Sequence, residues 1–299
     1  MQVMPLATIL TPTYNRATLL VRCYQSLLRQ TNKNFDWMVI DDGSTDDTNK
    51  IVKGFQQEHK IKIRYIQKAN GGKHTALNLG IKQIQSDLTF IVDSDDYLSD
   101  DAVETIYRYY KKYKDHNGLC GFSFLRMHPD GKLYCKALPK DEFIESFIEC
   151  RINRHIGGDM AEVFYTQCLM KYPFPEFSGE KFIGEDVVWI KMALNYKLVF
   201  INKPVYYADY LEGGLTHSGK TMRIKSPLGA MERAKMLMTK QCILSNRIKG
   251  ILLYVCYGKF ANKTFNYLYH NCEYILLLLS FYPFGVILHS LWKRKYMKG

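Results

Sequence analysis

Short apolar runs alternate with amphipathic stretches along residues 7–113. Runs such as "FDWMVID" have strand length and end in polar residues, whereas "ATLLVRCYQSLLRQ" repeats apolar residues at helical spacing. The pattern predicts strands at 7–13, 35–42, 61–67 and 88–93, and helices at 17–30, 45–58, 75–85 and 101–113. Strands that alternate with helices at this pace predict parallel βαβ units and an α/β fold.

Polar clusters follow each of the predicted strands. They lie at Thr11–Tyr14, Asp41–Asp42, Asn70–Lys73 and Asp93–Asp96. In open α/β sheets, ligands bind at the carboxyl ends of the strands. We therefore expect these clusters to meet at one edge of the sheet and to form a binding site.

The cluster of Asp93, Asp95 and Asp96 directly follows the buried-type run Leu88–Val92. One interpretation is a turn that leads into a helix near Asp100, because Asp and Ser favour turns and helix N-termini. The other is a site for a divalent cation, which turns the repulsion between carboxylates into coordination. The stretch alone fits both equally, and the convergence of polar clusters favours the cation.

The segment 118–210 has a less regular pattern. "GLCGFSFLRMHPDGKLYC" predicts a hairpin around Pro-Asp-Gly, and a later loop leads into a helix that opens near Glu185. Asp186 has two interpretations there: a plain acid stabilised by the helix dipole, or a general base. Because no G-x-x-x-x-G-K-[ST] or G-x-G-x-x-G stretch is present, the acid-lined edge suggests metal-mediated diphosphate binding instead.

Charge divides the chain into two parts. Residues 219–299 hold 14 of the 41 Lys and Arg residues and two of the 29 Asp and Glu residues, which leaves residues 1–218 with 27 of each sign. A neutral domain followed by a basic tail predicts different partners for the two parts. The eight Cys residues show no C-x-x-C spacing and the N-terminus shows no signal-peptide pattern, so we expect free thiols in a reducing cytoplasm.

The ordered pieces "TPTYN", "VIDDGSTDDT", "NGGKHTALNLG", "VDSDD" and "GED", with a following Trp, resemble the inverting family 2 glycosyltransferases with a GT-A fold. The similarity is greatest to bacterial members that build capsules and other surface polysaccharides. It covers residues 6–218 and implies a catalytic domain at 1–218, with a nucleotide-sugar half at 1–100 and an acceptor half at 101–218. Residues 219–299 would then be a separate helical tail.

The resemblance implies a role for each matching position. The nucleotide would be held by Thr11, Tyr14, Asp42, Lys73 and Asp93, with Asp42 accepting from uracil N3–H. Asp95 would be the main ligand of Mn²⁺ or Mg²⁺, and Asp93 would lean toward the ribose or a metal-bound water. Asp186 would deprotonate the acceptor hydroxyl, which attacks the anomeric carbon in line and inverts it.

Other residues have a candidate role beside an ordinary one. His217 would ligate the metal or the diphosphate, or is a solvated loop histidine. Lys220 and Arg223 would clamp phosphate, or they begin the basic tail. Glu185 and Trp189 would contact the acceptor or a sugar face, and Trp189 fits core packing at least as well.

The implied activity is transfer of one sugar from a nucleotide sugar, in particular a UDP-sugar, to a lipid-linked saccharide in bacterial surface polysaccharide synthesis. The chain lacks the Q-x-x-R-W motif and the several membrane spans of processive members, so we expect a non-processive enzyme. The rival interpretations are a sugar-nucleotide nucleotidyltransferase and a catalytically inactive carbohydrate-binding relative.

The segment Tyr274–Trp292 contains no Asp, Glu, Lys or Arg and could just span a bilayer by length. A single span would place the cluster Lys293–Lys295 opposite the cytoplasmic catalytic domain, against the positive-inside rule, and Pro283 and Gly285 should break a helix. We therefore expect an in-plane helix or a shallow hairpin on the anionic cytoplasmic face of the membrane. The alternative is a soluble helical appendage; nucleic acid is not an expected partner, because the tail lacks a dispersed basic face.

Overall fold

The computed structural model describes residues 5–134, 138–156, 158–208 and 219–297. The chain divides into two compact units. The first consists of residues 1–146, 156–173 and 195–209, and the second of residues 147–155, 174–194 and 210–299.

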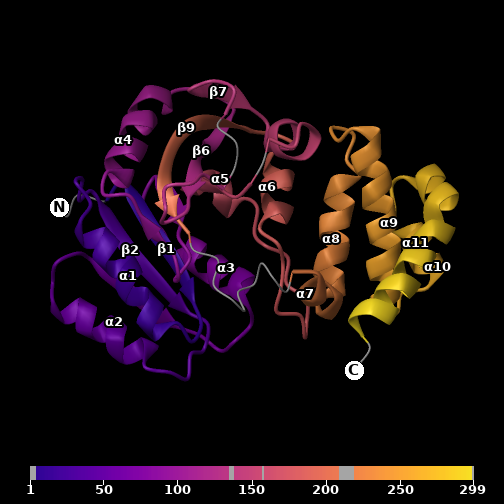
Figure 1. Ribbon diagram of the computed structural model, residues 1–299, viewed down its shortest axis with the longest axis horizontal. Helices are drawn as coiled ribbons and strands as arrows, with labels where there is room; N and C mark the ends of the chain where they lie inside the picture. Colours follow the sequence, from indigo (N-terminus) through magenta and orange to yellow (C-terminus); the bar gives the residue numbers. More distant parts are fainter. Residues whose placement is uncertain (1–4, 135–137, 157, 209–218, 298–299) are drawn as a thin grey trace. The chain divides into compact units, whose positions relative to one another are not determined.

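The first unit is built on one mixed sheet with the strand order β3-β2-β1-β4-β8-β6-β9-β5, and β7 pairs with β9 (Figure 1). Its strands are β1 (Ala7–Thr13), β2 (Phe35–Asp41), β3 (Ile63–Gln67), β4 (Leu88–Ile91), β5 (Tyr97–Leu98), β6 (Leu119–Met127), β7 (Glu142–Glu145), β8 (Met160–Tyr165) and β9 (Lys197–Tyr207). Strands β3, β2, β1 and β4 are parallel, as the sequence predicts. Strand β8 then runs antiparallel to both β4 and β6.

Helices cover both faces of the parallel part of the sheet. They are α1 (Ala17–Leu28), α2 (Thr48–Gln57) and α3 (Lys73–Gln83), followed along the chain by α4 (Ala102–Tyr113) and α5 (Thr166–Met170). On one face Tyr24 of α1 packs against both Trp37 and Phe55, with ring centroids 5.9 and 4.0 Å away, and the Trp37 and Phe55 rings lie 6.2 Å apart. On the other face α3 lies so close to β1 that a Cβ at Gly80 would be 2.4 Å from Leu10 Cδ1. This layered arrangement confirms the predicted α/β class.

The predicted hairpin around Pro-Asp-Gly is present as a tight turn. The His128 backbone N–H donates to the Lys132 carbonyl at 2.7 Å, and Met127 bridges to Leu133 in antiparallel fashion. The pairing extends one residue further, since the Tyr134 N–H donates to the Arg126 carbonyl at 3.2 Å.

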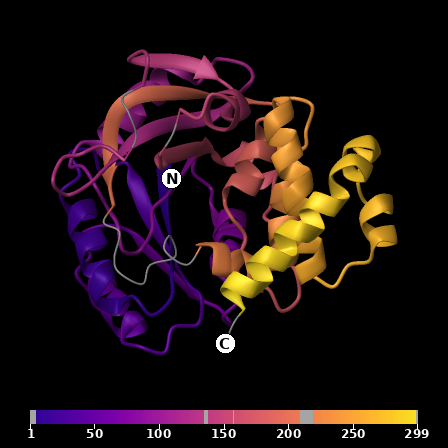
Figure 2. The ribbon, with the colours of Figure 1, turned by 45° about the vertical axis from the view of Figure 1, so that its right-hand side comes forward.

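The second unit is helical and has its own core. It contains a π-helical turn (Ile148–Asn153), α6 (Asp186–Met192), α7 (Gly219–Lys225), α8 (Pro227–Leu237), α9 (Leu244–Phe260), α10 (Phe265–His270) and α11 (Ile275–Tyr296). Helices α8 and α11 both pack on α9, which Figures 1 and 2 show in orange and yellow. Buried residues such as Met231, Ile251 and Leu278 form the core between them. The compact units therefore do not follow the predicted boundary at residue 218, because residues 174–194 pack with the C-terminal helices.

Helix α11 runs without interruption through Pro283, so the prediction that Pro283 and Gly285 break this segment is wrong. Pro283 lies on the exposed side of the helix. On the opposite side Gly285 is buried against α9, where a Cβ would lie 2.5 Å from Val255 Cβ. Packing of α11 on α9 maintains the helix despite the hydrogen bond that proline cannot make. Among the described residues, α11 alone is long and apolar enough to cross a membrane, which is weak evidence by itself.

Candidate active site

Direct bonds join the predicted polar clusters at the carboxyl ends of β1, β2 and β4. The Asp42 backbone N–H donates to the Thr13 carbonyl at 2.8 Å. The Asp42 carboxylate in turn binds the turn before α3, and Lys73, the first residue of α3, forms an ion pair with Asp93. The sheet therefore brings together the clusters that sequence reasoning assigned to one edge.

Asp42 organises the Gly-rich turn at residues 70–72. Its Oδ1 accepts from Lys68 Nζ at 2.7 Å and from the Gly71 N–H at 2.9 Å. Its Oδ2 accepts from the Gly72 N–H at 2.7 Å and from Asn70 Nδ2 at 3.1 Å. A carboxylate offers about four lone-pair positions, so these bonds use its whole capacity. Contact with a uracil N3–H would have to replace one of them.

The Thr11 side chain faces the core and not the sheet edge. It is fully buried and accepts a hydrogen bond from Trp37 Nε1 at 2.9 Å. The Thr11 side chain therefore does not reach the sheet edge, where the predicted nucleotide contact would lie. Two residues further along, the buried Thr13 hydroxyl has no hydrogen-bond partner among the described residues. Tyr14 follows it and exposes 48% of its surface, as a residue that stacks on a base requires. Asn15 joins this loop to the next, donating from its N–H to Ser44 Oγ at 2.9 Å.

The acidic cluster after β4 carries strongly perturbed carboxyl groups. Burial acts to raise the pKa of Asp93, but the positive charges of Lys73 and Arg126 outweigh it and leave that pKa below its usual value. Burial and the negative charge of Asp93 raise the pKa of Asp95. The same two causes raise the pKa of Asp96 to about 7. Crowded carboxylates of this kind are costly without a cation, and carboxyl groups with perturbed pKa values cluster at functional sites.

Two residues that sequence reasoning missed hold this cluster in place. Tyr206 and Arg126 are register partners on β9 and β6, and the Arg126 guanidinium lies 4.2 Å from the centroid of the Tyr206 ring. The Tyr206 hydroxyl donates to Asp96 Oδ2 at 2.7 Å and accepts from the Asp93 N–H at 3.0 Å. An arginine at the end of the otherwise apolar run "LCGFSFLRM" was the signal in the sequence for Arg126.

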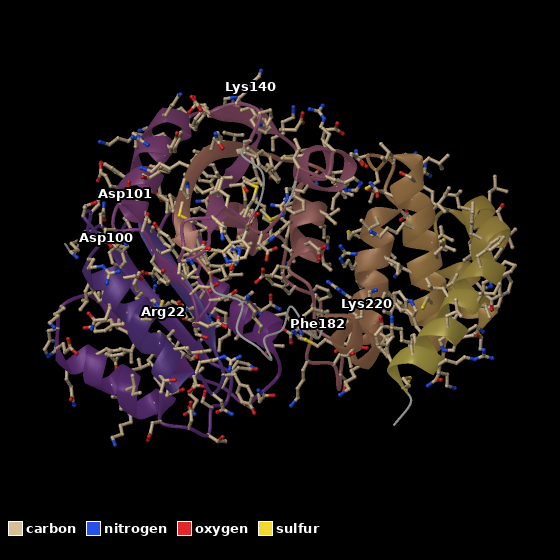
Figure 3. All side chains as sticks on the ribbon, in the orientation of Figure 1. Arg22, Asp100, Asp101, Lys140, Phe182 and Lys220 are labelled. Atoms are coloured by element: carbon tan, nitrogen blue, oxygen red, sulfur yellow. The ribbon has the colours of Figure 1, made fainter. Side chains whose placement is uncertain are left out.

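Arg22 fixes the backbone on the other side of the cluster (labelled in Figure 3). It donates through Nη2 to the Asp95 carbonyl, and its guanidinium lies 5.0 Å from the centroid of the Tyr97 ring. The Asp95 backbone is therefore held by a contact that does not use its carboxylate.

The donor set fits a hard divalent cation that a substrate helps to bind. Among the described residues no three His, Cys, Asp or Glu side chains are grouped to hold an ion by themselves. Mg²⁺ and Mn²⁺ in nucleotide-dependent enzymes are held by one or two carboxylates together with substrate phosphates and water. Asp93 and Asp95 supply two such carboxylates, and Lys73 adds a positive charge beside them.

Asp186 lies in the second unit, in the first turn of α6. Its Oδ2 accepts a hydrogen bond from Arg233 Nε of α8 at 2.6 Å. Its Oδ1 extends back over Gly184, where a Cβ would lie 2.8 Å from that oxygen. The carboxylate is therefore held on one side by a cation and has space on the other because residue 184 is a glycine.

The structure separates the weaker candidates. Trp189 is buried against Phe174, with ring centroids 5.9 Å apart. Of its two interpretations, the structure supports core packing and not stacking on a sugar. Lys220 lies 5.7 Å from the centroid of the Trp292 ring and Arg223 lies 5.8 Å from that of Phe182, so both contact aromatic rings of the second unit. Glu185 precedes α6 directly. His217 lies outside the described residues.

Solved structures share this fold. S. aureus TarS in complex with UDP-GlcNAc superposes with a TM-score of 0.63 at 18% identity, over 97% of this chain and 92% of TarS. The mannosyltransferase PcManGT from Pyrobaculum calidifontis, in complex with GDP-Man and Mn²⁺, gives a TM-score of 0.57 at 16% identity, over 100% and 89% of the two chains. The fold is therefore the GT-A fold of glycosyltransferases.

Sequence comparisons narrow the class to a family. Residues 8–131 match Glycosyl transferase family 2. The chain is 30% identical over 211 residues to the glycosyltransferase GlyG of Streptococcus pneumoniae, covering 67% of this chain and 69% of GlyG. It is 38% identical over 100 residues to the chondroitin synthase of Escherichia coli, 33% of this chain but 14% of that protein. This chain belongs to glycosyltransferase family 2.

Proposed function

We propose that the chain is an inverting, metal-dependent, non-processive glycosyltransferase that moves one sugar from a UDP-sugar to a lipid-linked saccharide of a bacterial surface polysaccharide. The observation that carries the proposal is the pair Asp93 and Asp95 beside Lys73 at the end of β4. Related proteins support it, since the TarS and PcManGT complexes contain nucleotide sugars and PcManGT contains Mn²⁺. The chain spans 69% of GlyG but only 15% of the longer GlyA. The acceptor is therefore not taken from these relatives and is inferred from the apolar and basic surface of α11.

The nucleotide would lie along the carboxyl ends of β1 and β2. Tyr14 offers an exposed ring for stacking on the base. Asp42 would act through the turn that it organises and not by direct contact with uracil, and this turn leads into Lys73 beside Asp93, where Lys73 would meet the diphosphate.

The charged side chains of the site would have different roles in the transfer reaction. Asp93 and Asp95 would hold Mn²⁺ or Mg²⁺, which when bound offsets negative charge on the leaving diphosphate. Lys73 adds a second positive charge there. Asp186 would take the proton of the acceptor hydroxyl as this attacks the anomeric carbon from the face opposite the diphosphate, which inverts the configuration.

Donor binding and product identity test the proposal. We expect one of UDP-glucose, UDP-galactose, UDP-N-acetylglucosamine and GDP-mannose, with Mn²⁺, to raise the melting temperature, because ligands that bind only the folded state stabilise it. Turnover of that donor should release the nucleoside diphosphate. Release of pyrophosphate from a nucleoside triphosphate and a sugar 1-phosphate, without release of nucleoside diphosphate from any of these donors, would instead identify a nucleotidyltransferase. A lack of any turnover with bound donor would identify an inactive binding relative.

The outward face of α11 supports the membrane part of the proposal. Its exposed apolar side chains lie on one side of the helix; they are Leu276, Leu279, Phe284, Ile287 and Leu291, with Leu276 82% exposed. The basic cluster Lys293, Arg294 and Lys295 follows in the last turn. An apolar helix face next to cations is suited to lie in the plane of an anionic membrane surface, where lipid-linked acceptors are found.

Changing this face should remove membrane binding while the fold stays intact. We expect the variant Phe284→Gln/Ile287→Gln to bind vesicles of phosphatidylcholine and phosphatidylglycerol at least about tenfold more weakly, because two apolar side chains no longer enter the lipid. Vesicle sedimentation measures the effect. The matched control Val21→Gln/Met170→Gln changes two exposed apolar residues of helices in the first unit and should bind normally.

Salt should weaken vesicle binding without abolishing it, since only the cationic contribution is screened. Equal binding of the α11 variant and the wild-type chain would exclude this helix face as the membrane contact. Point substitutions are preferable to truncation after Cys272, because truncation would also expose the surface of α9 that α11 covers.

A further inference from the structure

The loop that leads into Asp186 packs on α8, and α8 lies in the part of the chain that sequence reasoning assigned to the tail. Glu180 caps this helix: its two carboxylate oxygens accept from the Leu228 and Gly229 N–H groups at 2.7 and 2.8 Å. The helix also approaches the loop closely, since a Cβ at Gly229 would lie 2.7 Å from Ile183 Cδ1. The 180–186 loop therefore depends on α8 for its position.

Arg233 makes the contact nearest to the candidate chemistry. It lies on α8, and its Nε donates to Asp186 Oδ2 at 2.6 Å. Both side chains are about three-quarters covered, with 23% and 26% of their surfaces exposed, so the pair is partly shielded from water. Hydrogen bonds between ionised groups are the strongest and most directional that proteins form.

We propose that Arg233 is a positioning residue that acts through Asp186; this rests on the proposed role of Asp186 as the base. Because Arg233 engages Oδ2, it sets the rotation of the carboxyl group and leaves Oδ1, the oxygen over Gly184, for the proton of the acceptor hydroxyl. The C-terminal helices are then part of the catalytic machinery and not a removable tail. Misplacement of a catalytic group by about 1 Å can lower a rate about a hundredfold.

A comparison in two backgrounds tests this role. Arg233→Met keeps the length of the side chain but removes the guanidinium, and it should lower kcat by about 10- to 100-fold with the donor KM unchanged. Arg233→Lys should recover part of the loss. In an Asp186→Asn background, Arg233→Met should have no further effect, because there is no longer a base to orient. The assay is nucleoside diphosphate release from whichever donor of the panel above the wild-type chain turns over.

Lys235→Met is the matched control, since Lys235 is also a cation of α8 and pairs with Glu232 at 2.8 Å with similar exposure. It should leave kcat unchanged. An equal loss from Arg233→Met in both backgrounds would overturn the proposal, because Arg233 would then act independently of Asp186. If Arg233→Met does not fold, Arg233→Lys in the two backgrounds decides the question in the same way.

The two proposals fail in different ways. Near-normal turnover by Asp186→Asn overturns the assignment of the base and this inference with it. A large loss in Asp186→Asn together with normal turnover in a folded Arg233→Met variant overturns this inference alone.

Discussion

Asp95→Asn is expected to lower kcat by about a thousandfold or more and to raise the Mn²⁺ concentration needed for half-maximal activity. The cation and the groups around it supply several kcal/mol of stabilisation to a leaving diphosphate, and each 1.36 kcal/mol corresponds to a tenfold change in rate. Burial and the charge of Asp93 raise the pKa of Asp95, so removal of its charge relieves repulsion within the protein. Thermal stability should therefore be unchanged or higher. Steady-state rates across a Mn²⁺ titration measure the effect.

The control for Asp95→Asn is Asp100→Asn, the same chemical change at an exposed residue that pairs with Arg29 at 2.9 Å (Figure 3). This variant should keep normal turnover and normal response to Mn²⁺. A variant at position 95 with the wild-type Mn²⁺ dependence would show that Asp95 is not a metal ligand.

Asp186→Asn is expected to lower transfer to the acceptor by about 10² to 10⁴, the range in which general acid–base catalysis contributes. Asparagine can still accept from Arg233, so the fold of the second unit should be preserved. Donor affinity should be unchanged, because the proposed nucleotide residues belong to the first unit. Transfer rates and donor titrations on the same preparation separate the two quantities.

Glu185→Gln is the informative comparison for this prediction, since Glu185 is the adjacent carboxylate and directly precedes α6. If Asp186 is the base, the loss in Glu185→Gln is much smaller. A larger loss at position 185 than at position 186 would move the role of base to Glu185.

The first 113 residues illustrate how far local pattern reaches. Apart from the two-residue strand β5, the elements from β1 to α4 were predictable because each has its own contiguous apolar run or helical stripe, and βαβ connections fix the parallel order of β1 to β4. The insertion of β8 between β4 and β6 was not, because it depends on pairings such as Thr89↔Phe164, which join residues far apart in the chain. No local window of sequence contains such a pairing.

The candidate active site likewise combines features that are local in the sequence with features that depend on distant segments. Its acidic residues and the Gly-rich turn were evident because they are adjacent in sequence, whereas Arg126 and Tyr206 reach the cluster only through the register of β6 with β9. Thr11 was misassigned because alternation along β1 does not say which face is covered, and α1 and α2 cover the face that Thr11 shares with Trp37. The sequence also did not decide between sugar stacking and core packing for Trp189, because helical spacing does not say which face of α6 is covered.

The sequence by itself determined the family, the fold class and the identity of the charged residues, because these depend on residue types at fixed spacings along one strand or turn. The tertiary structure decided which of those residues are already paired: Asp42 with its turn, Asp93 with Lys73, and Asp186 with Arg233. It also decided that α11 continues through Pro283 and that α8 supports the loop of the candidate base. These features result from contacts between distant segments, whose packing outweighs local preference.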